Sequence, residues 1–420
     1  MDHVVAYSTL AMTVGLAVSR PRIGRGHWEI TPGIAALLGV LVLLVAGMLR
    51  PDDLLAAAKL QWRPLLSLTC VMVMTGVVKE VGAFDRMAAS IEAEARRAGT
   101  SRAFDLVFLA SVLTAALLNN DAGIILLTPV VVTMARRLHP GRPRVVEAFA
   151  FAVFLAPGVA PFTISNPMNM VVAEVAGLSF NRYAAIMGPI SLVGALLTYA
   201  ILRLYYRQAL RAEVGASALP PPPVQSPAER PALFLLLAVF LSYPVMATLG
   251  GPTWVVALLG ALCSLLLLWA YDVVPLPQIR KHVSLDILAF LWGVFLVVAG
   301  LRSVGLTEHL SAFYAAHGQS LGLIGLTSAL GSALVDNHPM SILNLMALQG
   351  QADHRPLLAA LVGGDIGPRL LPIGSLAGLL WLELLRRSGL TVRTRRFMLL
   401  GTITLVPTLG ASLLLLWWSA

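Results

Sequence analysis

Long apolar runs, repeated from one end of the chain to the other, constrain the fold more than any other feature of this sequence. Of the 420 residues, 58% are hydrophobic and only 12% are charged. Many runs approach the ~20 residues that a helix needs to cross a bilayer, and no long polar stretch could form a soluble catalytic domain. We therefore expect an all-α polytopic membrane protein.

The apolar runs divide into two similar sets. Helices are expected in the first half at about 3–19, 31–49, 64–84, 145–175 and 183–205. In the second half they are expected at about 230–249, 252–272, 283–304, 356–385 and 396–418. Segment 85–100 mixes charged and apolar residues in the manner of an interfacial amphipathic helix.

Two further apolar stretches, 103–136 and 319–352, are interrupted in the middle by polar residues. Each stretch is too long for one membrane-spanning helix, but its two arms are short for two such helices. Both therefore predict a re-entrant helical hairpin, whose tip must be buried in protein or line a water-filled cavity.

The order of these elements predicts three regions: a first repeat at 1–205, a Pro-rich linker at 206–229, and a second repeat at 230–420. Five crossings per repeat is an odd number, so the second repeat is expected to be inverted relative to the first. With the N-terminus outside, 22 of the 30 Lys and Arg residues fall in inner loops and six fall outside. This bias favours an inner membrane protein with both termini outside.

A cluster of three polar residues lies at the centre of each predicted hairpin. These are Asn119-Asn120-Asp121 and Asp336-Asn337-His338. Asn and Asp can cap the broken arms, but one cap would suffice for each. Ionisable groups at membrane depth are costly, so matching clusters in both halves indicate function.

A second pair of polar sites interrupts the helices expected at 145–175 and 356–385. Pro161 and Pro167 break the first, and Pro372 with Gly374 breaks the second, because proline lacks a backbone donor and glycine tolerates unusual angles. Unwound helices of this kind form midplane binding sites in transporters. The neutral groups available there are Thr163, Ser165, Asn166, Asn169, Gly374 and Ser375.

Asp365 and Arg369 lie four residues apart just before the second break. They can pair on a helix, either as a gate or as a structural ion pair.

An enzyme is the rival class. Tyr271-Asp272 and Gly364-Asp365 faintly resemble an intramembrane aspartic protease, but Val362 stands where that motif needs glycine. No phosphate-binding glycine loop is present, so this chain is not expected to hydrolyse ATP. Cys70 and Cys263 lie singly in apolar runs, and we expect no metal and no cofactor.

The segment Gly364-Asp365-Ile366-Gly367-Pro368-Arg369, continuing through Pro372-Ile373-Gly374-Ser375, resembles the signature of the arsenite efflux permease (ArsB) family of the ion transporter superfamily. Asn120-Asp121 and Ser165-Asn166 are also similar to motifs of that family, and the resemblance covers essentially the whole chain. Asp336 and His338 depart from it, because an asparagine and an apolar residue are expected there.

The resemblance implies export of arsenite and antimonite driven by proton entry, and a fold with a scaffold part and a mobile transport part that carries the hairpins and broken helices. It also implies that some members dock a soluble ATPase subunit. The partners left open are such a subunit and a second copy of the chain, and no nucleic acid is expected.

The residues support this reading by their chemistry. Arsenite near neutral pH is mainly an uncharged trihydroxy species, which neutral donors and acceptors can satisfy. We expect these to come from the polar groups of the two breaks, together with Asn120 and Asn337. The proton is assigned first to Asp121, then to Asp336, with His338 as a further titrating group.

The alternative is a sodium–proton antiporter or a sodium-coupled carboxylate transporter of the same fold. A carboxylate carrier should offer Ser-Asn-Thr in both halves, and Gly374-Ser375-Leu376 lacks the asparagine. Backbone carbonyls at both breaks would still suit sodium, so the coupling ion is left open.

Overall fold

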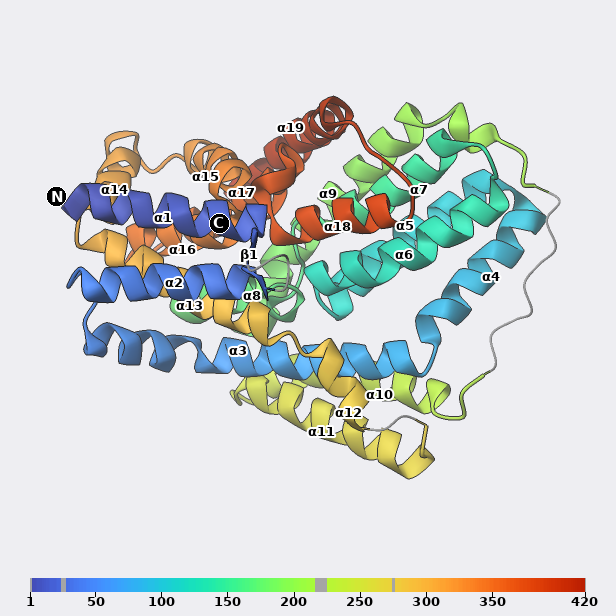
Figure 1. Ribbon diagram of the computed structural model, residues 1–420, viewed down its shortest axis with the longest axis horizontal. Coiled ribbons are helices and arrows are strands. Elements are labelled where there is room, and N and C mark those ends of the chain that lie inside the picture. The colour runs from blue at the N-terminus through green and yellow to red at the C-terminus, as the bar shows by residue number, and fades with distance from the viewer. Residues whose placement is uncertain (1, 24–27, 216–224, 274–275, 420) are drawn as a thin grey trace.

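The computed structural model describes residues 2–23, 28–215, 225–273 and 276–419, which form a bundle of α-helices (Figure 1). The first half contains α1 (Asp2–Ser19), α2 (Pro32–Val45), α3 (Pro51–Glu80), α4 (Ala83–Ala98), α5 (Thr100–Leu117), α6 (Asn120–Leu138), α7 (Pro143–Leu155), α8 (Pro167–Val175) and α9 (Phe180–Tyr205). The second contains α10 (Glu229–Thr248), α11 (Thr253–Tyr271), α12 (Leu276–Ile279), α13 (Leu285–Arg302), α14 (Leu306–Ala316), α15 (Leu321–Val335), α16 (Asn337–Leu348), α17 (Arg355–Ile366), α18 (Leu376–Arg387) and α19 (Thr394–Trp418). The expected all-α class is confirmed.

Short elements join some of these helices. They are the 3₁₀ turns η1 (Thr163–Ser165), η2 (Ala209–Arg211), η3 (Arg280–His282), η4 (Gly367–Arg369) and η5 (Pro372–Gly374). The strands β1 (Arg22–Ile23) and β2 (Trp28–Glu29) form one antiparallel pair. The Pro-run of the predicted linker lies in 216–224, outside the described residues.

The start of one helix and the presence of another differ most from the prediction. The third helix begins at Pro51 rather than near 64, because Pro51 and two acidic residues occupy its first turn and Pro64 is accommodated inside it. No helix is predicted between 304 and 319, yet α14 forms there. It follows α13 as the amphipathic α4 follows α3.

By length and composition, six helical segments can each cross a membrane: α5, α9, α10, α11, Pro277–Arg302 and α19. The pair α3 and α4, bent by 54°, brings the number to seven. The ten crossings expected from the sequence therefore also need short or broken helices, such as α2 with 14 residues, to span the bilayer.

The unbroken helices α1, α2, α3, α10, α11 and α13 pack against one another as one group. Within it α2 contacts α13 closely, because Gly293 carries no side chain: a Cβ there would lie 2.8 Å from the Cβ of Ala36. Such small residues let membrane helices approach. We call this group the scaffold set.

A second group, the hairpin set, consists of the hairpin arms, the broken helices and the helices that pack with them, which are α5 to α9 and α15 to α19. Figure 1 shows α5 and α6 toward one end of the longest axis, together with α4, and α15 and α16 toward the other end, together with α14. The breaks between α7 and α8 and between α17 and α18 lie between these two ends. This placement brings polar residues from both halves together.

Candidate functional site

Both predicted hairpins are helical hairpins. In the first, α5 and α6 are joined at residues 118–119, and Thr100 Oγ1 lies 3.2 Å from His139 Nε2 where the two arms end. In the second, Asn344 Nδ2 of α16 donates to Ser328 Oγ of α15 over 3.0 Å. Each pair of arms therefore runs antiparallel from a polar tip.

Both predicted breaks are also present. The first separates α7 from α8 between Leu155 and Pro167, and the second separates α17 from α18 between Ile366 and Leu376. Each break packs on the first arm of its own hairpin: Ser165 Oγ donates to the carbonyl of Ala116 over 2.6 Å, and η5 contacts α15.

Four helices begin at these tips and breaks, and a polar side chain caps each of them. The capping residues are Asn119 for α6, Asn166 for α8, Asp336 for α16 and Ser375 for α18. A helix N-terminus presents backbone N–H groups and the positive end of the helix dipole. The region therefore favours ligands that carry oxygen acceptors.

Four titratable residues form one electrostatic cluster at the tips and the second break: Asp121, Asp336, His338 and Asp365. His338 Nδ1 lies 3.0 Å from Asp336 Oδ1, and its charge also interacts with those of Asp121 and Asp365. Asp336 and His338 are buried, whereas Asp121 and Asp365 are partly exposed. Both halves thus contribute acids to a single cluster.

Asp336 holds a costly backbone conformation at the second tip. Its φ is 79°, a region that residues with a side chain rarely adopt and that costs about 1–3 kcal/mol. Its carboxylate compensates by accepting the His338 N–H at 3.0 Å. The ring of His338 meets the scaffold residue Phe290 edge to face at 5.8 Å, so this tip contacts the scaffold set.

The expected pair between Asp365 and Arg369 is not formed. Helix α17 ends at Ile366 and residues 367–369 form a 3₁₀ turn, which removes the helical spacing that the pair needs. Asp365 instead accepts from Asn166 Nδ2 at 3.1 Å and from the backbone N–H of Ala160 at 3.4 Å.

Arg369 is buried, and its side chain, like that of Asp365, forms hydrogen bonds with residues of the first half. Its guanidinium donates to the carbonyl of Leu155 at 2.8 Å and to the hydroxyls of Thr198 and Thr408. Leu155 is the last residue of α7, where carbonyls lack helical partners and the dipole is negative. A cation from one break therefore stabilises the helix end at the other.

Several buried polar atoms near the tips and breaks make no hydrogen bond with any described residue. They are Asn119 Nδ2, Asn120 Oδ1, Asn169 Oδ1, Asn337 Oδ1, Ser332 Oγ and the hydroxyl of Tyr183. A buried polar atom without a partner is costly, so these groups are suited to a polar solute. Asn120 also lines a cavity of about 20 Å³ beside Gly158, Ala160 and Ser191.

Other predicted site residues are held in structural hydrogen bonds or packing contacts. Ser165 bonds the first hairpin, as described above, and Ser375 Oγ accepts the N–H of Gly378 at 3.0 Å. Gly374 packs tightly, since a Cβ there would lie 2.8 Å from the Cα of Pro368 and 3.1 Å from that of Ala333. Asn169 Nδ2 donates to the carbonyl of Phe162 at 3.2 Å, which leaves only its Oδ1 available.

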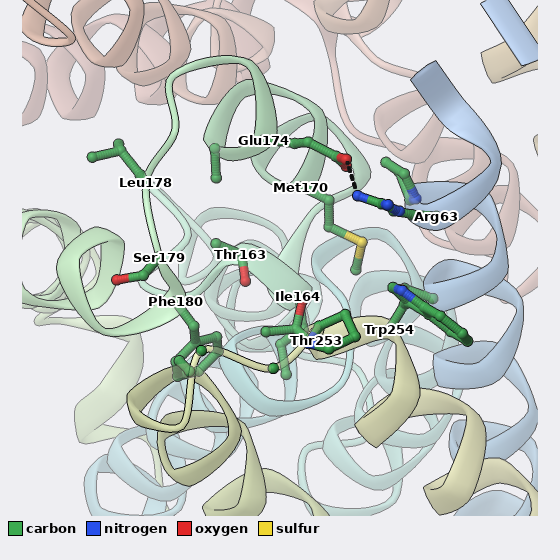
Figure 2. Close-up of a pocket in the computed structure, with 17 residues that line it drawn as sticks. Arg63, Thr163, Ile164, Met170, Glu174, Leu178, Ser179, Phe180, Thr253 and Trp254 are labelled. Carbon is green, nitrogen blue, oxygen red and sulfur yellow. Dashed lines mark hydrogen bonds and ion pairs between the residues drawn. The ribbon is translucent and has the colours of Figure 1, made fainter. Parts of the chain in front are cut away.

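Thr163 lines a separate, larger cavity of about 300 Å³ between the scaffold set and the first break. Figure 2 shows Thr163 of the first break on one side and Arg63 and Trp254 of the scaffold set on the other. Arg63 of α3 forms an ion pair of 3.0 Å with Glu174 of α8 beside this cavity. The cavity thus links the break to the surface.

Ser332 and Tyr183 are not among the site residues predicted from the sequence. No sequence motif marks either residue, and their unpartnered hydroxyls in the structure reveal them. Tyr183 also interacts electrostatically with Asp365, which is nearly two hundred residues away in sequence. Asn119, by contrast, is visible in the sequence as the first residue of its polar cluster.

The sequence comparisons agree with one another. Residues 11–418 match the ArsB family model, described as arsenical pump membrane protein. The arsenical pump membrane protein of Escherichia coli K12 is 29% identical over 98% of this chain and 97% of its own length. That of Yersinia enterocolitica is 27% identical, with the same coverage.

A solved structure has a similar fold. The crystal structure of the YdaH transporter of Alcanivorax borkumensis aligns with a TM-score of 0.60 over 100% of this chain and 97% of that chain, at 17% sequence identity.

Proposed function

Because this chain belongs to the ArsB family of arsenical pump membrane proteins, we propose that it is a secondary transporter that exports arsenite, and the similar antimonite, in exchange for protons. We place it in the bacterial inner membrane with both termini outside, in line with the arginine bias of its loops. A soluble ATPase subunit and a second copy of the chain remain the protein partners to be tested.

The proposed substrate site lies at the hairpin tips and helix breaks. Neutral arsenite offers three hydroxyl groups, each a donor and an acceptor. The unpartnered amide atoms of Asn120, Asn169 and Asn337 supply complementary groups without a charge. The capped N-termini of α6, α8, α16 and α18 add favourable dipoles for its oxygen atoms.

The proposal of proton coupling rests on one observation, the cluster of Asp121, Asp336, His338 and Asp365. A neutral substrate brings no charge of its own, so coupling requires a protein group that gains and loses a proton. Asp121 is the primary proton carrier in this proposal, because it is an acid at a tip and is partly exposed. Asp336 and His338 form a second, more deeply buried pair.

Transport proceeds by alternating access. The hairpin set moves against the scaffold set and exposes the cluster first to one side and then to the other. Among the contacts that cross the boundary between the sets are Phe290 with His338 and Arg63 with Glu174. The cavity beside Arg63 is the proposed outer vestibule, through which arsenite leaves.

The test is transport by purified protein in liposomes. We expect arsenite flux under an imposed proton gradient and none under a sodium gradient of equal size. Flux driven by sodium alone would favour the alternative of a sodium-coupled transporter. The absence of arsenite and antimonite flux under either gradient, with the protein correctly folded, would overturn the proposal.

A further inference from the structure

A second cavity, of about 580 Å³, lies away from the proposed transport site, where α7 begins and α9 ends. Its lining includes Arg142, Arg144, Tyr205, Gln208 and Arg211. Among the described residues that line it, none is acidic. A concave surface with three guanidinium groups selects an anion, and arginine suits phosphate oxygens in particular.

Two of these arginines are available for a ligand. Arg142 and Arg211 are exposed, and their side chains make no hydrogen bond or ion pair with any described residue. Arg144 is instead held in place, with its guanidinium 4.9 Å from the ring centre of Tyr205 and paired with Glu147 at 3.5 Å.

The surface that leads to the cavity is apolar. On α9, Leu192, Leu196, Ala200 and Leu204 are exposed at intervals of four residues, which forms one ridge along a helix. The same interval continues to Gln208, which lines the cavity. A ligand that fits both features carries an anionic phosphate head and a long apolar chain.

We propose that this cavity binds the headgroup of an anionic phospholipid, with an acyl chain lying along the exposed ridge of α9. Arg142 and Arg211 contact the phosphate, the N-terminus of α7 adds a favourable dipole, and Gln208 contacts the remaining headgroup oxygens. The proposal is independent of the transported substrate.

The experiment measures phosphatidylglycerol binding to the full-length protein in detergent by native mass spectrometry and by thermal shift. The test variant is Arg142→Gln/Arg211→Gln. The control is Arg207→Gln/Arg230→Gln, which removes the same charge from exposed positions outside the cavity. We expect the test variant to lose about tenfold in affinity and the control to stay within about twofold.

Further ligands identify the source of the phosphate. Phosphatidylcholine, inorganic phosphate and the acyl-free glycerophosphoglycerol headgroup should each bind far more weakly than phosphatidylglycerol. Equal losses in the two double variants would mean diffuse surface attraction and would overturn the proposal. So would tight binding of the acyl-free headgroup or of a poly-glutamate peptide, because either would identify a soluble anionic ligand.

Discussion

Asn166, in the break of the first half, donates its side-chain amide to the carboxylate of Asp365, before the break of the second half, over 3.1 Å. Arg369 makes the reciprocal link by donating to Leu155 of the first half. The two breaks are therefore held together by polar contacts that cross between the halves. We therefore expect a substitution that moves one break to displace the other as well.

Replacing Asp365 should separate its electrostatic role from its structural role. In Asp365→Asn the amide oxygen can still accept from Asn166, so we expect a folded protein that has lost arsenite flux. In Asp365→Ala the donors of Asn166 and Ala160 lose their acceptor, which should also cost about 1–3 kcal/mol of stability. Flux and thermal unfolding are measured on both variants. Asp272→Asn, an exposed acid after α11, is the control and should retain flux.

Asp121→Asn should abolish proton-driven arsenite uptake by everted vesicles, because the tip then has no proton to exchange. The fold should survive, since Asn119 rather than Asp121 caps α6. Normal uptake in this variant would transfer the coupling role to Asp336 or His338. The matching Asp336→Asn variant, which keeps a capping oxygen, then distinguishes between those two.

Gly363→Ala should destabilise the hairpin set by about 1–3 kcal/mol through overpacking. A Cβ there would clash with the carbonyl of Gly325 and lie 2.9 Å from the Cβ of Ser328, because α15 and α17 are in close contact. Gly194→Ala, with nothing within 4 Å of its Cβ, is the matched control on α9. Equal unfolding temperatures for the two variants would refute this account of the packing.

His139 lies where the two arms of the first hairpin end, and it should make the stability of the protein depend on pH. Burial lowers the pKa of His139 below its ordinary value, so the folded state disfavours the charged ring. The unfolded state therefore binds more protons, and this contribution to stability, present above the unfolded pKa of about 6.5, is lost as the pH falls. We expect the unfolding temperature of the wild type to fall more steeply between pH 7.5 and 5.5 than that of His139→Gln. Parallel curves would remove His139 from this role.

The Arg63–Glu174 pair should control access to the vestibule more than it controls stability. Both side chains are substantially exposed, so the pair is worth only about 0–1 kcal/mol. Repulsion in Arg63→Glu should open the cavity and speed the labelling of Thr163→Cys by a membrane-impermeant thiol reagent in a background lacking the native cysteines. Lys59→Glu, an exposed change on the same helix, should leave the rate unchanged. Equal labelling rates in the Arg63→Glu and Lys59→Glu variants would show that the Arg63–Glu174 pair does not control access to the cavity.

Much of the fold could be read from the sequence because its signals are local. Apolar runs predict the helices, and Pro161, Pro167 and Pro372 predict the breaks. The tips are marked by polar residues that cannot lie unpaired in an apolar helix. The predicted range 64–84 misses the start of α3 at Pro51, and Pro64 lies inside the helix because a long helix can accommodate an internal proline. Helix α14 was missed because its apolar face is short.

The sequence by itself determined which residues are polar at membrane depth and where the chain must break, since both follow from the cost of burying polar groups. Only the tertiary structure decided the partners of those residues. Asp365 bonds Asn166, which is 199 positions away, rather than Arg369, which is four away. Whether two groups can pair depends on the packing of segments from different halves and on where α17 ends. Neither this packing nor the end of α17 can be read from the spacing of residues along the chain.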